Sequence, residues 1–225
     1  MMKILGVDTT GSRLSVALSE DEKIIAEVYG DDSKKHLETL MPCLNELLKT
    51  TGNTVDDIDL YALSAGPGSF TGIRIGAAAV EAMAQKYGKD VVQVDTLDAL
   101  CRNVHSDAAV CAMIDARHDE VFARVVKGDE VLIGSGPVGV NDLLKEIGGR
   151  DTVFVGDGAI VYRDRITAFS NVYSIAEDDC ILQKGGSVCK AGYNMFLRGK
   201  VSSCFDIKPM YMKLSQAERY KKFGR

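Results

Sequence analysis

The sequence ILGVDTTGSRLSVALSEDEKIIAEVY, residues 4–29, sets the architecture of the chain because it places a buried strand directly before a hairpin. Its first four residues form a continuous apolar run, which is typical of a central strand that is covered on both faces. A polar turn, Asp8–Ser12, separates this run from two β-rich segments, Leu14–Ser19 and Lys23–Tyr29. The acidic pair between those segments suits a hairpin, so we predict three consecutive strands.

The residues that follow predict a helix with a wide apolar face. Leucine and methionine side chains recur at three- and four-residue spacing between Leu37 and Leu48. Ser33 can cap this helix at its N-terminus. Pro42 lies inside it and is expected to bend or break it, because proline lacks the backbone N–H that a helix interior uses.

Strands and helices then alternate, and the pattern occurs twice. The first set continues with a strand at Asp59–Ser64, a helix at Ile73–Lys86 and a strand at Val91–Val94. A helical segment at Leu97–Val104 separates it from the second set. That set comprises strands at Val110–Ile114, Val121–Val126 and Glu130–Ile133, a helix at Asn141–Ile147, a strand at Val153–Gly156, a short helix near Ile160, a strand near Val172 and a helix at Ser187–Phe196. Two rounds of β-β-β-α-β-α-β predict a structural duplication, with a mixed, helix-covered sheet in each half.

A duplicated unit of about 100 residues resembles the ribonuclease-H-like lobe that actin, sugar kinases and heat-shock ATPases share. The resemblance implies an α/β fold of two actin-like (ASKHA) lobes, each a mixed five-stranded sheet with helices. We place the first lobe at residues 1–100 and the second at residues 101–225, packed together along the join near residue 100. The basic tail Arg219–Arg225 is expected to be a solvated terminus, an RNA contact or a segment that packs back on the first lobe.

Composition argues against several classes of protein. The chain has 225 residues, of which 46% are hydrophobic, so it can bury a sizeable core. Its net charge of −5 argues against a self-sufficient nucleic-acid binder, because affinity for phosphate backbones comes mainly from clustered Lys and Arg. No uninterrupted apolar run approaches the roughly 18 residues that a membrane helix needs, so we expect a cytoplasmic protein.

Cysteine and histidine spacing predicts neither disulfides nor a metal site. The six cysteines form no C-x-x-C pair, and we expect them to be buried free thiols in a reducing compartment. They are Cys43, Cys101, Cys111, Cys180, Cys189 and Cys204. The three histidines, His36, His105 and His118, are scattered without ligand spacing. We therefore expect no bound metal, and for His36 a role as a contact or surface residue.

Two glycine-containing turns are candidate functional segments. In actin-like proteins the turn after the first strand holds a carboxylate for a metal-bound phosphate, and here Asp8, Thr9, Thr10 and Gly11 stand in that place. The same residues are also those of an ordinary turn. The turn Gly66–Gly72 opens a helix and could offer N–H groups to an anion, but it lacks the lysine of a P-loop.

The helix after the second turn carries two adjacent strips of small or apolar residues. One strip is Gly72, Gly76, Ala79 and Met83, and the other is Ile73, Ala77, Val80 and Ala84. Small residues at this spacing permit close packing. Two such strips predict a second buried face in addition to the core-facing one, either inside the chain or against a partner.

Several motifs together resemble the bacterial TsaB (YeaZ) family, in order and over essentially the whole chain. They are Leu5–Thr10, His36–Pro42, Ala65–Gly76, Asp115–Phe122, Gly156–Ala159, Pro209–Lys213 and Ala217–Glu218. The resemblance implies a supporting role in making N6-threonylcarbamoyladenosine on tRNAs that read codons starting with A. It implies pairing with the catalytic subunit TsaD, joined by the small ATPase TsaE, with tRNA met only as part of the complex.

The resemblance also implies that the first two helices form the interface, both with TsaD and in a homodimer. The residues that we assign to this interface are His36, Leu37, Leu40, Met41, Leu44, Ile73, Arg74, Ala77, Val80, Glu81 and Ala84. A vestigial nucleotide cleft would consist of Asp8, Thr9, Thr10, Asp115, Gly156, Asp157 and Gly158.

One departure from the catalytic relatives favours a non-catalytic protein without a cofactor. TsaD-type sequences carry H-x-x-x-H after the fifth strand, where histidines four residues apart can bind one metal ion. Thr96 and Leu100 occupy those places here, so we expect no catalytic residue. Two alternatives stay open: a metal-dependent peptidase or ATPase that uses Asp8 and Asp115, and a nucleotide sensor whose adenosine cleft includes Gly156–Ala159.

Overall fold

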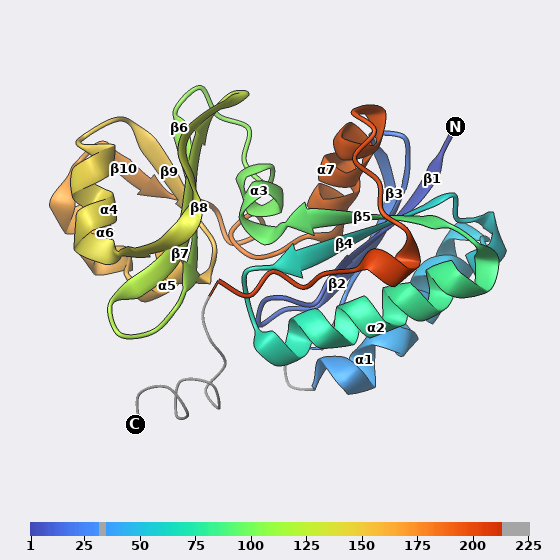
Figure 1. The fold of residues 1–225 in the computed structure, drawn as a ribbon. Coiled ribbons are helices and arrows are strands. Elements are labelled where there is room, and N and C mark those ends of the chain that lie inside the picture. Colours follow the sequence, from blue (N-terminus) through green and yellow to red (C-terminus); the bar gives the residue numbers. More distant parts are fainter. Residues whose placement is uncertain (32–34, 213–225) are drawn as a thin grey trace.

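The computed structural model describes residues 1–31 and 35–212, which fold into two five-stranded sheets flanked by helices (Figure 1). Ser33 and the basic tail lie outside the described residues, so their predicted roles stay predictions. Both sheets are mixed, as predicted, and the strand order of one repeats that of the other.

The first sheet has the strand order β3-β2-β1-β4-β5. Its strands are β1 (Lys3–Asp8), β2 (Ser15–Glu20), β3 (Lys23–Tyr29), β4 (Leu60–Gly66) and β5 (Asp90–Asp95). β1 pairs antiparallel with β2 and parallel with β4, so that Leu5 lies between Leu18 and Tyr61. Every residue of β4 is buried, as is β1 after its first residue, because helices cover both faces of these central strands.

Two helices cover one face of this sheet, α1 (His36–Thr51) and α2 (Phe70–Tyr87), with a short 3-10 helix, η1 (Val55–Asp57), between them in the sequence (Figure 1). α1 continues through Pro42, so the predicted break does not occur. It ends at Gly52, whose positive φ of 66° forms a left-handed cap.

The second sheet has the order β10-β9-β6-β7-β8. Taken from its other edge, β8-β7-β6-β9-β10, it repeats the order of the first sheet with equivalent strands. Its strands are β6 (Ala109–Asp115), β7 (Glu120–Lys127), β8 (Glu130–Gly139), β9 (Thr152–Val155) and β10 (Tyr173–Ile175). Helices α4 (Val140–Ile147), α5 (Asp157–Val161) and α6 (Arg163–Phe169) contribute side chains to the core on its outer face. The predicted duplication is confirmed.

The last helix of each repeat lies between the two sheets (Figure 1). α3 (Thr96–Cys101) follows the first sheet but packs mainly on β6 and β7 of the second. α7 (Gly185–Leu197) follows the second sheet but packs on all five strands of the first. A boundary at residue 100 therefore separates α7 from the sheet that it covers.

Asn103, which is buried just after α3, connects α3 and α7 through hydrogen bonds. Its side-chain nitrogen donates hydrogen bonds to the carbonyl oxygens of Cys180 and Leu182, both at 2.8 Å. The Ser187 hydroxyl on α7 donates to the Asn103 side-chain oxygen at 2.6 Å. One buried amide thus links α3 to the chain segment that enters α7.

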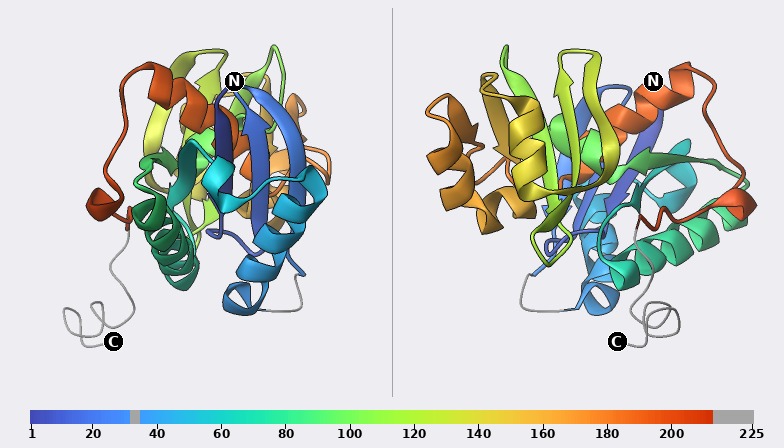
Figure 2. Two further views of the ribbon diagram at one scale, coloured as in Figure 1. Left: turned by 90° about the vertical axis from the view of Figure 1, so that its right-hand side faces the viewer. Right: turned by 60° about the vertical axis from the view of Figure 1, so that its left-hand side comes forward.

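Residues 198–212, the C-terminal strap, run back along the first lobe, and Figure 2 shows them leaving α7 and reaching α2. Ser202 pairs with Val91 at the edge of β5, and the Gln93 side chain contacts the strap at Ser202, Asp206 and Lys208. The short 3-10 helix η2 (Cys204–Asp206) rests on α2. The strap therefore covers a sheet edge that would otherwise be open.

The six cysteines are free, and all but Cys180 are buried, as predicted. Burial raises the pKa of Cys101 and of Cys189 to about 12, which keeps these thiols protonated and unreactive near neutral pH. Among the described helices none is both long and apolar enough to cross a membrane.

Candidate functional site

Glycines fix the N-terminal end of α2 against the turn that follows β1. Ser69 caps the helix by accepting a hydrogen bond from the Gly72 N–H at 3.2 Å, and the Ser69 N–H donates to the Thr10 carbonyl oxygen at 2.7 Å. A Cβ at Gly72 would collide with the Thr9 carbonyl oxygen, and one at Gly76 with the Thr9 hydroxyl. The small residues of α2 therefore allow close packing on this chain's own first turn.

The strip of α2 that we assigned to the partner interface is buried within the chain. Ile73, Ala77, Val80 and Ala84 are at most 8% exposed, and the last three belong to the core between α1, α2 and the sheet. The assignment of this strip to the interface is therefore wrong, and the alternative of a face inside the chain holds. Gly72 and Gly76 beside it are buried as well and extend the face that covers the sheet.

Two residues of α1 that we assigned to the interface are buried as well. Leu40 is 3% exposed and Leu44 is 2% exposed, and both pack in the core under α1. Leu40 nevertheless reaches the wall of a surface groove. These side chains support the exposed face rather than form it.

An apolar groove with a volume of about 550 Å³ runs between α1 and α2, and we call it the α1–α2 groove. Its walls are Leu37, Leu40, Met41, Phe70, Thr71, Arg74, Ile75, Ala78 and Ala79. Leu37 is 73% exposed and Met41 is 52% exposed, which is unusual for large apolar side chains on neighbouring turns of one helix. A contiguous exposed apolar surface of this kind is typical of a protein–protein contact.

The groove brings together some of the predicted interface residues and adds others. Leu37, Leu40, Met41 and Arg74 line it, whereas Glu81 is exposed on α2 outside its walls. His36 lies at the start of α1, where its Nε2 is 2.8 Å from the Gly11 carbonyl oxygen. A third strip of α2, which the sequence prediction did not include, is formed by Thr71, Ile75, Ala78 and Ala82, and its first three residues line the groove.

An aromatic cluster closes one end of the groove. The rings of Phe70 and Tyr211 stack with their centroids 4.4 Å apart. The Arg74 guanidinium lies 4.1 Å from the centroid of Phe70, and its Nε donates a hydrogen bond to the Tyr211 hydroxyl at 3.1 Å. Tyr211 belongs to the C-terminal strap, so residues 137 positions apart in the sequence share one surface.

The carboxylate of the first turn is enclosed by its own chain. Asp8 is fully buried; one of its oxygens accepts hydrogen bonds from the Thr10 N–H and hydroxyl, at 2.8 and 2.7 Å, and the other accepts one from the Ser64 hydroxyl. Burial raises the pKa of Asp8, and these hydrogen bonds act in the opposite direction. In this conformation Asp8 is a structural acceptor that reaches no solvent.

A glutamine from the second lobe packs on the same turn. Gln183 is 1% exposed and lies against Gly11, where a Cβ would collide with its amide group. Both polar atoms of this amide are buried, and neither has a hydrogen-bond partner among the described residues. Gln183 thus fills the space beside this turn.

The acidic residues of the second lobe form a separate cluster. Asp157 accepts a hydrogen bond from the Asp115 N–H at 3.1 Å, and Asp115 accepts one from the Tyr162 hydroxyl at 3.3 Å. Desolvation raises the pKa of Asp157, and the nearby Asp115 charge adds to this. Gly156 and Gly158 pack on the backbone of Met113. Within residues 1–31 and 35–212, the hydrogen bonds of Asp8 stay in the first lobe and those of this cluster stay in the second.

The places of the two metal-binding histidines lie in α3 and are buried. Thr96 is 0% and Leu100 is 1% exposed, and Leu100 packs in the core between α3 and the second sheet. In the part of the chain that the structure describes, no three His, Cys, Asp or Glu side chains gather as a metal site would require.

The fold defines the class of protein: two duplicated ribonuclease-H-like lobes make an actin-like ASKHA protein. A likeness to the activator of 2-hydroxyisocaproyl-CoA dehydratase from Clostridium difficile, solved with bound ADPNP, agrees with this class; its TM-score is 0.52 at 14% identity, over 88% of this chain and 97% of that one. YeaZ from Pseudomonas aeruginosa has a TM-score of 0.76 at 22% identity, over 94% of this chain and 100% of that one.

Sequence comparison gives the family. A family model described as tRNA N6-adenosine threonylcarbamoyltransferase matches residues 23–219. The chain is 27% identical to the tRNA threonylcarbamoyladenosine biosynthesis protein TsaB of Escherichia coli, over 94% of this chain and 95% of that protein. It is 25% identical to the TsaB protein of Bacillus subtilis, over 96% of each. The chain therefore belongs to the tRNA N6-adenosine threonylcarbamoyltransferase family, and its relatives place it in the TsaB (YeaZ) branch.

Proposed function

We propose that this chain is a non-catalytic scaffold in the biosynthesis of N6-threonylcarbamoyladenosine on tRNA, and that it pairs with a TsaD-type catalytic subunit through the α1–α2 groove. The observation that carries this proposal is the exposed apolar wall of the groove, which includes Leu37 and Met41. Removing such side chains from water at an interface with a partner lowers the free energy and so favours binding.

The names of the relatives support the pathway. The Escherichia coli and Bacillus subtilis relatives are both described as tRNA threonylcarbamoyladenosine biosynthesis proteins, and each aligns with nearly the whole chain. Thr96 and Leu100 on α3 support the non-catalytic role, because neither side chain is a usual metal ligand.

The proposal includes the other members of the assembly. A TsaE-type ATPase would join the pair, and tRNA would be met only within the complex, since the chain itself carries a net charge of −5. The complex would work in the cytoplasm. In the absence of TsaD the same groove would form a homodimer, because an isologous contact covers the apolar walls of both copies.

Reconstitution tests the function. The chain alone is expected to make no modified adenosine on tRNA. Added to TsaD, TsaE and the threonylcarbamoyl-adenylate synthase, it is expected to restore the reaction, with modified adenosine measured by mass spectrometry of digested tRNA. Turnover by this chain without TsaD would contradict the proposal.

A single substitution tests the groove. Met41→Lys places a charge on the apolar wall and is expected to weaken pairing with TsaD about thirtyfold, as loss of an important interface contact commonly does. Val161→Lys is the matched control, because Val161 is 59% exposed on α5 of the second lobe. Isothermal titration calorimetry measures both. Equal affinities for the two variants would rule out the groove as the interface.

A further inference from the structure

A second cavity, distinct from the α1–α2 groove, lies between the two lobes. Its volume is about 540 Å³, and α3, α7, β6, β7 and the hairpin after β7 supply its walls. We call it the interlobe pocket. Val110 and Val126 line it, so it lies at the opposite end of β6 and β7 from the Asp115 turn. The pocket is therefore separate from the acidic cluster of the second lobe.

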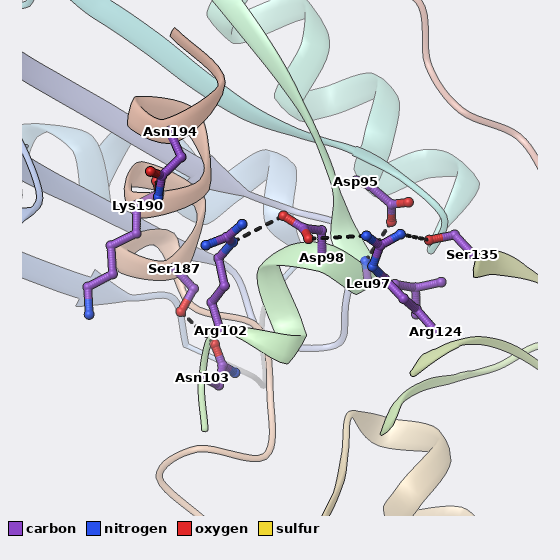
Figure 3. A network of polar contacts seen from close by, with 10 residues as sticks. All are labelled: Asp95, Leu97, Asp98, Arg102, Asn103, Arg124, Ser135, Ser187, Lys190 and Asn194. Atoms are coloured by element: carbon purple, nitrogen blue, oxygen red, sulfur yellow. Dashed lines mark hydrogen bonds and ion pairs between the residues drawn. The ribbon is translucent and has the colours of Figure 1, made fainter. Parts of the chain in front are cut away.

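The back wall of the pocket carries more positive than negative charge. Asp98 on α3 lies between two guanidinium groups, with the Nε of Arg102 at 3.1 Å and a terminal nitrogen of Arg124 at 3.6 Å (Figure 3). Each carboxylate oxygen contacts a different arginine. One carboxylate thus serves two cations, and the excess positive charge faces an enclosed space.

Three further donor groups line the pocket, and none has an acceptor among the described residues. The Nε of Arg124 is buried and finds no hydrogen-bond partner within residues 1–31 and 35–212, although the other guanidinium nitrogens contact Asp98 and Ser135. Lys190 on α7 and Arg198 just after it also line the pocket, and no ion pair of either side chain is found among the described residues. For the buried Nε of Arg124 the lack of an acceptor is costly, which makes an external acceptor favourable.

The remaining charges of the lining lie where solvent reaches them. Glu22 and Asp129, the other two carboxylates, are exposed, and so are His105 and Arg198. Charges in that position are screened by water and ions much more than the charges of the back wall. The electrostatics of the inner pocket are thus set mainly by Arg102, Arg124, Lys190 and the single carboxylate Asp98.

We propose that the interlobe pocket binds a small molecule that carries a phosphate dianion. A phosphate group offers acceptor oxygens to several guanidinium and ammonium donors at once, and it matches the fork of an arginine. The volume suits a small metabolite. Because Lys190 lies on the helix that covers the first sheet and Arg124 lies on the second sheet, an occupant would join the two lobes.

Titration calorimetry and thermal melts test this proposal at constant ionic strength set with sodium chloride. Inorganic phosphate and AMP are expected to bind and to raise the melting temperature, whereas adenosine, which lacks phosphate, is expected to do neither. Tighter binding of AMP than of phosphate would identify a nucleotide as the source of the phosphate group. Equal binding would identify phosphate itself.

Substitutions locate the site. Lys190→Gln is expected to weaken phosphate binding about tenfold, and Arg198→Gln, at an exposed position, to weaken it less; Lys49→Gln, on the exposed end of α1, is expected to change nothing. Neither pocket residue is in an ion pair of the described chain, so both variants are expected to melt like the wild type without ligand. No saturable binding up to about 10 mM, or binding that survives both pocket substitutions, would overturn the proposal.

Discussion

Val80 shows at the scale of one residue how the spacing of apolar residues along a helix can suggest the wrong face. It is 0% exposed in the core under α2, while its neighbour Glu81 is exposed. Val80→Arg is expected to lower the free energy of unfolding by about 3 kcal/mol or more, because it buries an unpaired charge. Glu81→Arg, the control, is expected to change it by less than about 0.5 kcal/mol. Urea unfolding measures both, and a Val80→Arg variant as stable as the control would contradict the described packing of α2.

Asp8 makes stability depend on pH in a defined direction. Burial raises its pKa in the folded chain above the ordinary value of 3.8. A carboxyl group with a raised folded pKa stabilises the fold most at pH values below its unfolded pKa, and this contribution is lost as the pH rises through the folded pKa.

We therefore expect the stability of the wild type, relative to Asp8→Asn, to fall as the pH rises from about 4 toward 7. Urea unfolding of both proteins over this range measures the difference, and asparagine cancels the contributions of all other titrating groups. A relative stability that grows with rising pH would show that the turn favours the ionised carboxylate.

Individual site residues could be predicted only where sequence order alone determined their place. Asp8, Thr9 and Thr10 lie together in the turn after β1, and Asp115 lies with Gly156–Gly158, because strand ends and short turns fix them. Gln183 and Tyr211 could not be predicted because their contacts join segments more than 130 positions apart. No local periodicity encodes such contacts.

At the scale of one element, the glycines of α2 lower its helix propensity but allow close packing on the turn after β1. Gly72→Ala should favour an isolated helix by up to about 1 kcal/mol, since alanine is the better helix former. In this protein the added Cβ would meet the Thr9 carbonyl oxygen, so we expect a net loss of about 2 kcal/mol, as overpacking commonly causes.

The control for this prediction is Gly134→Ala. Gly134 lies in β8, and a methyl group added to its Cα would meet no atom of any residue beyond its two chain neighbours within 4 Å. Its replacement is therefore expected to change stability by less than about 0.5 kcal/mol. Thermal melts compare the two variants. A Gly72→Ala protein that melts at or above the wild-type temperature would show that α2 does not rest on the turn as described.

The α1–α2 groove shows that the spacing of apolar residues in a helix does not distinguish core residues from exposed ones. Leu37 and Met41 follow the leucine spacing of α1, but that spacing does not say which positions face the sheet. Leu40 and Leu44 satisfy the same pattern and are buried. The sequence predicted both helices and most of their residues. It did not predict which of their side chains face the core and which face the groove, because that depends on how the helices pack on the sheet.

At the scale of the molecule, the duplication could be predicted because each repeat keeps the same order of strands and helices. That order could not predict that α3, from the first repeat, packs mainly on the second sheet and that α7, from the second repeat, packs on the first. Both helices are largely apolar, and a buried helix carries no mark of which sheet it covers. The choice depends on the geometry of the join, in which Asn103 holds the segment that leads into α7.

The C-terminal strap is expected to stabilise the whole first lobe. Two truncations test this: one after Met212, which keeps the strap, and one after Lys200, which removes the Val91, Gln93 and Phe70 contacts. We expect the shorter protein to melt at a temperature roughly 5 °C or more below that of the longer one. It should also aggregate more readily, because the edge of β5 becomes open to another strand. Equal melting temperatures would show that the strap is only a loose covering.

The exchange of α7 also affects how the protein is made. The Cys189 thiol donates to the Ile4 carbonyl oxygen at 3.5 Å, across 185 positions of sequence. A ribosome releases the chain from its N-terminus, so one face of the first sheet emerges long before the helix that will cover it. The first lobe is thus begun before the second and completed after it, and its apolar face stays open to chaperones and to aggregation until α7 has been translated.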